Sequence, residues 1–292
     1  MSLNLDNKFV RLSIEKSLRD LPALPGIVAR VLEETENPDA SAQSVERLLS
    51  SDQALASKVL RVVNSAYYGL SGQITSLSQA IMILGMPQVR NLVLSVSALS
   101  VLKPKTPRQQ ETLKQFWLHA FGTAAATQLI AKQKRMRVND CEALFLGGLL
   151  HDIGKLFLYS MFTQTYDQVL KYAQDKQIPV LEAEAKMLGL THGEIGATMA
   201  STWKLPQLLG EIISRHEGPF KEGDDPSLFA VHVGDRLTQH LYHQNEGVVA
   251  AAIEPLAEEW LDLTAEELES VREGTERRLE DAAALFGLLA AA

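Results

Sequence analysis

Apolar residues recur at helical spacing along almost the whole chain, and no segment alternates convincingly between apolar and polar positions as a half-buried strand does. Over residues 42–49, for example, Val45, Leu48 and Leu49 fall on one face of a helix. Residues 52–63 repeat the pattern, with an acidic residue in the N-cap position. The pattern predicts an all-α fold in which short helices joined by short turns form a multi-helix bundle.

Capping boxes mark three of the predicted helix starts, since Ser or Thr is followed three residues later by Gln or Glu. Gly85 and the pair Gly218-Pro219 mark helix ends. The last of these boxes begins a long amphipathic helix. Its apolar face is expected either to cover the core or to contact a second subunit, and covering the core is the default interpretation. The three boxes are Ser76 with Gln79, Thr191 with Glu194, and Thr264 with Glu267.

Residues 103–108, Lys-Pro-Lys-Thr-Pro-Arg, are the best linker in the chain. Their prolines end one helix and, with Thr106 as N-cap, begin a long helix that runs through Ile130. We therefore divide the chain into an N-terminal helical bundle over residues 1–105 and a second helical domain over residues 106–292. Because the linker is short, we expect the two parts to pack tightly.

Composition narrows the class of protein. The 292 residues are 46% hydrophobic and 22% charged, which is ordinary for a soluble globular protein. The net charge of -8 argues against a nucleic-acid partner. The longest apolar stretches are about half of a bilayer span, and the N-terminus lacks a secretion signal. A single cysteine, Cys141, excludes an internal disulfide and fits a buried apolar role in a reducing compartment. These features predict a cytoplasmic protein without a membrane partner.

The stretch Phe-Leu-Gly-Gly-Leu-Leu-His-Asp-Ile-Gly-Lys, residues 145–155, delivers an adjacent imidazole and carboxylate from a helical apolar run. Neighbouring helical residues point roughly 100° apart, so His151 and Asp152 can share one ion only if it lies close over the backbone between them. Lys155 projects from the same side and could meet an anionic ligand. Alternatively, the glycines permit close helix packing and His151 and Asp152 satisfy only each other.

Further imidazoles and carboxylates occur where other predicted helices present them, and His119 lies mid-helix in apolar surroundings where an unpaired polar group is costly. Alone, His119 is typical of a core histidine bonded to a carbonyl. Together, four imidazoles and two carboxylates suit one or two ions of Fe, Mn, Zn or Ni, and suit calcium poorly. The candidate metal ligands are His119, His151, Asp152, His192, His216 and Asp235.

Four nearby residues have other predicted roles. His232 could face the site one helical turn before Asp235, although this is the less favoured interpretation. His240 and His243, near a helix end, are expected to be exposed. Glu217 could be a base or could orient a metal ligand, but an exposed surface carboxylate is the favoured interpretation.

The order His119, His151-Asp152, Asp235 resembles the HD superfamily of metal-dependent phosphohydrolases, and the flanking sequence resembles specifically its HDOD branch. The resemblance implies an HDOD-type bundle over residues 1–105 and an HD-type helical half over residues 106–292. The matching segments are Leu21–Pro25, Asp52–Gly69, Ile74–Ile81, Leu84-Gly85, Leu149–Lys155 and Trp203–Pro206.

The related branch with cyclic di-GMP phosphodiesterase activity has a second His before the position of His216 and a Gly-Tyr-Pro segment soon after it. This chain has Arg215 before His216, and Glu-Gly-Pro-Phe follows. The resemblance therefore implies a bacterial signalling or regulatory module without established hydrolase activity. Such a module acts through signalling-protein partners or a small ligand, for example a nucleotide.

Two alternatives remain open. In a metal-dependent phosphohydrolase, the six ligands would hold the ions, a bound water would be the nucleophile, and Asp152 and Lys155 would be catalytic, with Lys155 steadying the phosphate. In the second alternative, the candidate ligands form a buried polar network that has only a structural role. For the signalling role, the loop with Tyr67 and Tyr68 is the candidate recognition surface, although packing within the bundle is the favoured role of those side chains.

Overall fold

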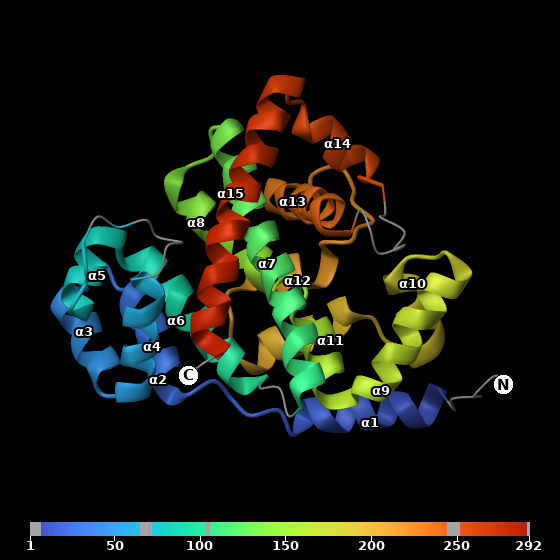
Figure 1. Cartoon of the computed structure of the whole chain (residues 1–292), viewed down its shortest axis with the longest axis horizontal. Coiled ribbons are helices and arrows are strands. Elements are labelled where there is room, and N and C mark those ends of the chain that lie inside the picture. The colour runs from blue at the N-terminus through green and yellow to red at the C-terminus, as the bar shows by residue number, and fades with distance from the viewer. Residues whose placement is uncertain (1–6, 65–69, 71, 103–105, 244–251, 291–292) are drawn as a thin grey trace.

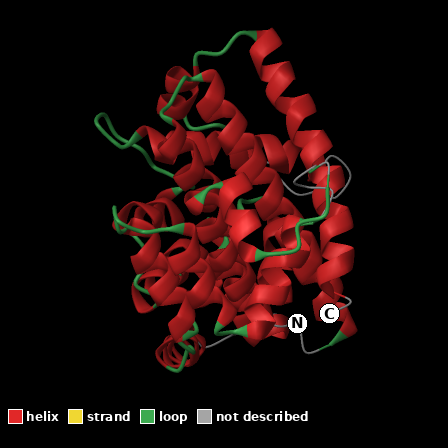
Figure 2. Ribbon diagram, turned by 90° about the vertical axis from the view of Figure 1, so that its left-hand side faces the viewer, coloured by secondary structure: helices red, strands yellow, loops and turns green. Residues whose placement is uncertain are grey.

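The computed structural model describes residues 7–64, 70, 72–102, 106–243 and 252–290. Every regular element in these residues is an α-helix, which confirms the all-α prediction (Figures 1 and 2). The helices are α1 (Asn7–Arg19), α2 (Gly26–Glu36), α3 (Ala42–Ser50), α4 (Gln53–Val63), α5 (Leu77–Leu84), α6 (Met86–Val101), α7 (Pro107–Gln133), α8 (Val138–Leu150), α9 (Ile153–Lys176), α10 (Val180–Leu188), α11 (His192–Thr202), α12 (Gln207–Arg215), α13 (Pro226–His243), α14 (Pro255–Leu261) and α15 (Ala265–Ala290).

Local capping begins the helices where the sequence predicts. Asp52 accepts a hydrogen bond from the Leu55 amide at the start of α4, and Thr106 accepts one at the start of α7. Thr191 forms the complete predicted capping box with Glu194. The box at Ser76 is only half formed, because Gln79 accepts its bond from the Thr75 amide instead of the Ser76 amide.

The long helix α7 lies at the centre of the fold and packs against α8, α13 and α15 (Figure 1). Its backbone approaches α8 so closely that a Cβ added at Gly148 would lie 2.7 Å from the Ala124 Cα. Such an approach requires glycine, because backbone atoms cannot rotate out of the way. The glycines before His151 therefore do permit close helix packing, as one interpretation of the sequence predicted.

Helix α15 runs along α7 and covers it. An added Cβ at Gly122 of α7 would meet the Leu279 side chain at 2.9 Å, and Arg278 donates a hydrogen bond of 2.7 Å to Gln128. Its first turn has the predicted capping box, since Thr264 and Glu267 bond reciprocally. The described part of this helix thus covers the core.

The two halves of the chain share one apolar core. Buried side chains in α2–α6 join those of α7–α12 in a single cluster, and α1 lies against α10 and α11 instead of the N-terminal bundle. Arg11 in α1 donates to the Gly189 carbonyl, and Trp203 donates to the Pro22 carbonyl, both at 3.1 Å. Division of the chain at residue 105 stays a prediction, and residues 103–105 lie outside the described part.

Two further predictions concern single residues and the membrane. Cys141 is buried, at 5% exposure, as expected. Tyr67 and Tyr68 lie outside the described residues. In the described part of the chain, no single helix has the length and apolar character of a membrane span, although the bent pair Leu77–Leu84 and Met86–Ala98 meets that test together.

Candidate metal centre

His151 and Asp152 lie at the junction of two helices. Helix α8 ends at Leu150, and Asp152, with φ -98° and ψ 18°, is the N-cap of α9. The apolar helical run therefore ends just before His151, and a second helix begins directly after Asp152. An N-cap carboxylate commonly accepts a first-turn amide, but the Asp152 side chain makes no such bond and is left for other groups.

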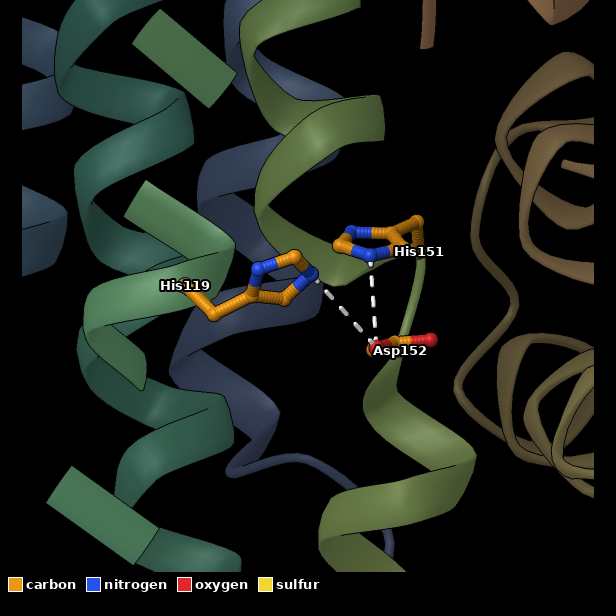
Figure 3. A group of neighbouring side chains, drawn as sticks. All are labelled: His119, His151 and Asp152. Atoms are coloured by element: carbon orange, nitrogen blue, oxygen red, sulfur yellow. Dashed lines mark ion pairs between the residues drawn. The ribbon is translucent and has the colours of Figure 1, made fainter. Parts of the chain in front are cut away.

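One side of the cluster joins α7, the α8–α9 junction and α13. His119 Nε2 lies 2.9 Å from Asp235 Oδ1 and 3.8 Å from Asp152 Oδ2. His151 Nε2 lies 3.4 Å from Asp152 Oδ2 and 3.5 Å from Asp235 Oδ1. Figure 3 shows the His119 and His151 rings converging on Asp152.

The other side of the cluster joins α11 and the end of α12. His192 Nε2 lies 3.5 Å, and His216 Nε2 3.4 Å, from Asp152 Oδ1. Asp152 thus stands between two pairs of imidazoles. All six predicted ligands come together, and none is more than 8% exposed. The groups whose ligand atoms lie within 4.8 Å of one another are His119-His151-Asp152, His151-His216-Asp235 and Asp152-His192-His216.

Hydrogen bonds at Nδ1 orient three of the rings. Each Nδ1 faces a carbonyl or carboxylate acceptor, so it carries a proton, and Nε2 is the nitrogen directed into the cluster, where a ring without a second proton presents its lone pair. Among the described residues, His151 Nε2 and Asp152 Oδ1 have no hydrogen-bond partner. The bonds run from His151 to Gly148 O at 2.6 Å, from His216 to Ile213 O at 3.1 Å, and from His192 to Glu184 Oε2 at 2.6 Å.

The contact between two imidazoles indicates a cation. His192 Nε2 and His216 Nε2 lie 3.3 Å apart, and the acceptors at both Nδ1 atoms leave a lone pair on each Nε2. Two facing lone pairs repel unless a proton or a metal ion lies between them. Burial lowers the pKa of His216, which disfavours the proton. Buried nitrogen and carboxylate donors without partners therefore fit a transition-metal ion.

The two carboxylates of the cluster are ionised and paired. Burial alone would raise the pKa of Asp152, but the charges of His151 and Lys155 hold it well below its usual value. Burial opposes the imidazolium of His151, but Asp152 and Asp235 outweigh this and raise its pKa to about 10. In the absence of a metal ion, protons and side-chain cations thus supply the positive charge that these carboxylates require.

Two cationic side chains contact the ligand carboxylates. Lys155 Nζ donates a hydrogen bond of 2.8 Å to Asp152 Oδ2, which agrees with its predicted placement on the same side. Arg236 donates one of 2.9 Å to Asp235 Oδ2 and also bonds to Glu217. The favoured interpretation of Glu217 as an exposed surface carboxylate is wrong, because its side chain is only 15% exposed and pairs with Arg236.

Among the described side chains, His232 and His240 are not ligands in this arrangement. His232 is buried, donates from Nδ1 to the His216 carbonyl at 2.7 Å and accepts the Glu254 amide at Nε2. Both of its nitrogens are engaged, so it supports the backbone of a ligand instead of facing the cluster. His240 is exposed, as expected, and the side chain of His243 lies outside the described residues.

Sequence reasoning did not identify Glu184 of α10, which is fully buried beside His192. Its Oε2 accepts both the His192 amide and Nδ1, while its Oε1 accepts the Tyr166 hydroxyl at 2.7 Å. A carboxylate in this position fixes the ring and raises its basicity as a ligand. Nothing in the local pattern of α10 distinguishes Glu184 from Glu182, the exposed carboxylate of the same helix, and only the fold brings Glu184 to His192.

Glu184→Ala is expected to weaken metal binding about 10–100-fold, the usual effect of losing a group that orients a metal ligand. Tyr166→Phe is the matched control, because it removes only the hydroxyl and keeps the carboxylate on His192. Competition with a chromogenic chelator measures the metal affinity of both variants. Unchanged affinity in the folded Glu184→Ala variant would show that His192 needs no such support.

The geometry is that of an all-helical protein with a histidine–aspartate centre of the HD type. The HDOD domain family matches residues 21–219, more than half of the chain. This chain belongs to the HDOD family. The match ends before α13, so Asp235 and Arg236 come from beyond the matched segment.

Individual relatives are distant. An uncharacterized protein of Treponema pallidum is 28% identical over 204 residues, which are 70% of this chain and 39% of the relative. The cyclic di-GMP phosphodiesterase CdgJ of Vibrio cholerae is 27% identical over 161 residues, 55% of this chain and 35% of the relative. The chain thus spans little more than a third of the length of these two relatives.

A solved structure supports the fold alone. It is that of a candidate signal transduction protein from Marinobacter aquaeolei, with a TM-score of 0.74 and 21% identity, covering 98% of this chain and 68% of the other. At this identity the similarity carries no information about a shared ligand or partner.

Proposed function

We propose that this chain is a cytoplasmic signalling or regulatory module whose helical core holds a transition-metal ion in a closed centre. It acts through protein partners or a small ligand such as a nucleotide. The observation that carries the proposal is the closure of the cluster. All six candidate ligands are at most 8% exposed, and both ligand carboxylates are already bonded to Lys155 or Arg236.

Closure favours regulation over turnover because a structural metal site is saturated by protein ligands, whereas a catalytic site keeps a position open for water or substrate. Arg215 occupies the position before His216, and its guanidinium bonds to Glu211 and Asp224 instead of entering the cluster. An ion bound here would tie α7, the α8–α9 junction, α11, α12 and α13 together and neutralise the two ligand carboxylates. Its occupancy would therefore change the stability of the whole C-terminal half.

The ligand chemistry restricts the metal. Four imidazole nitrogens and two carboxylate oxygens suit Fe, Mn, Zn or Ni, as one or two ions. Imidazole predominates, and this disfavours calcium and magnesium, which prefer oxygen ligands.

A metal-dependent phosphohydrolase is the second candidate, favoured by the contact between Lys155 and Asp152 and by the activity in the name of the Vibrio cholerae relative. In that case the bound ion would supply an activated water. Asp152 would hold the ion, and Lys155 would bind the phosphate after leaving the Asp152 carboxylate.

Elemental analysis of the purified, untagged protein tests the proposal together with an activity screen. We expect near-stoichiometric Fe, Mn, Zn or Ni, and no turnover of aryl phosphates, aryl phosphodiesters or cyclic di-GMP above a metal-only blank. Turnover abolished by Asp152→Ala would establish the phosphohydrolase instead. Failure to bind any of these ions, even after reconstitution, would contradict the metal centre and leave a structural polar network.

A further inference from the structure

Glu217 lies between the two buried cations of the site. One carboxylate oxygen bonds to the Arg236 guanidinium, and the other lies 3.9 Å from Lys155 Nζ and 3.9 Å from His192 Nε2. One carboxylate thus faces an arginine, a lysine and a candidate metal ligand at once. Arginine and lysine beside a metal site are the groups that proteins use to bind phosphate oxygens.

Glu217 is also the most exposed member of this charged network. Its side chain is 15% exposed, compared with 10% for Lys155, 5% for Arg236 and 5% for Asp152. The carboxylate is therefore at the most solvent-accessible edge of the network. A solvent anion that approached Lys155 and Arg236 from this edge would meet Glu217 first.

We infer that Glu217 occupies an oxyanion subsite at the mouth of the metal centre and closes it. A phosphate or phosphoester oxygen binds Lys155 and Arg236 only after the Glu217 carboxylate has left them. The inference rests on the proposed metal centre and adds a means of regulating access to it. It also gives a physical reason for the closure, because the chain supplies its own anion where an external one would bind.

The backbone bonds beside Glu217 do not depend on its carboxylate. The backbone around Glu217 is held on both sides, since the Gly218 amide donates to the Arg215 carbonyl at 2.8 Å and His232 donates to the His216 carbonyl at 2.7 Å. Neither bond involves the Glu217 side chain. The carboxylate can therefore leave while His216 keeps its position among the candidate ligands.

Glu217→Gln and Glu217→Ala test the inference, with inorganic phosphate as the probe and titration calorimetry as the measurement, on metal-free and Mn²⁺-loaded protein. We expect about tenfold tighter phosphate binding than in the wild type, because an open state populated at about a tenth weakens apparent affinity by that factor. Glu211→Gln is the matched control, since it removes an exposed carboxylate that pairs with Arg215 and touches neither Lys155 nor Arg236. Adding Lys155→Met to Glu217→Gln should abolish the gain.

Two results would overturn the inference. Equal phosphate affinity in the wild type and in both folded Glu217 variants would show that the carboxylate does not occupy an anion site. Loss of metal from Glu217→Gln, with metal retained in Glu211→Gln, would make Glu217 a metal ligand instead. Failure of the metal centre itself is a separate result, seen as absence of metal in the wild type, and the metal-free titration still decides the phosphate subsite.

Discussion

Asp152→Asn is expected to abolish metal binding and to lower the free energy of unfolding of the metal-free protein by about 3–5 kcal/mol, the usual cost of removing one partner of a buried ion pair. Asp152 touches four imidazoles and accepts the hydrogen bond from Lys155. The substitution preserves its shape but removes its charge. Lys155 is then left buried, with its other carboxylate, Glu217, 3.9 Å away.

Urea unfolding in the presence of a chelator measures the stability, and elemental analysis measures the metal. Asp152→Asn combined with Lys155→Met is the informative control, because it removes both charges and should recover most of the stability but none of the metal. Asp167→Asn breaks an exposed pair with Arg108 and should cost less than about 1 kcal/mol. Full metal content in Asp152→Asn would contradict the central place given to this carboxylate.

Local signals in the sequence predicted most of the helix starts correctly. Capping depends on residues only three positions apart, so Asp52, Thr106 and Thr191 act in the fold as their spacing indicates. The half-formed box at Ser76 has an equally local cause, since the Gln79 side chain reaches one residue further back than the pattern requires. Helical periodicity and capping together suffice for an all-α fold.

The break at His151-Asp152 could not be predicted from periodicity. The residues before and after it are apolar and buried on both helices, so one hydrophobic run continues across the junction. Hydrophobic periodicity indicates which residues are buried, and residues on both sides of a turn inside the core are buried alike. The break is what allows the imidazole and the carboxylate to face the same cluster.

The side chains that contact the candidate ligands could not be predicted reliably from the sequence either. Residue type and order suggested six ligands, and the family resemblance implied that they converge. Glu184 has no such mark, and for Glu217 the role beside a metal ligand was the less favoured interpretation, because each looks like the many exposed carboxylates of an acidic chain. Their burial beside His192 and Arg236 results from helix packing, which no short-range pattern encodes.

The remaining large effect concerns the glycine inside the His-Asp motif. Gly154 lies in the first turn of α9, where a Cβ would be 2.0 Å from the carbonyl oxygen and 2.8 Å from the carbonyl carbon of His192. These are backbone atoms, so no side-chain rotation relieves the clash, and α9 and α11 must separate. Because Asp152 and His192 lie at the starts of these helices, separation also moves two ligands of the centre apart.

Gly154→Ala is therefore expected to lower the free energy of unfolding by about 3 kcal/mol or more, at the upper end for overpacked cores, and to reduce metal content together with it. Gly210→Ala is the matched control: its added Cβ would lie 3.8 Å from the Ala200 Cβ, and alanine within α12 should stabilise that helix by up to about 1 kcal/mol. Urea unfolding and elemental analysis compare the two variants. A Gly154→Ala protein as stable as the wild type, with its metal retained, would show that the metal centre does not depend on close contact between α9 and α11. Retained stability with lost metal would confine the effect of this glycine to the placement of Asp152 against His192.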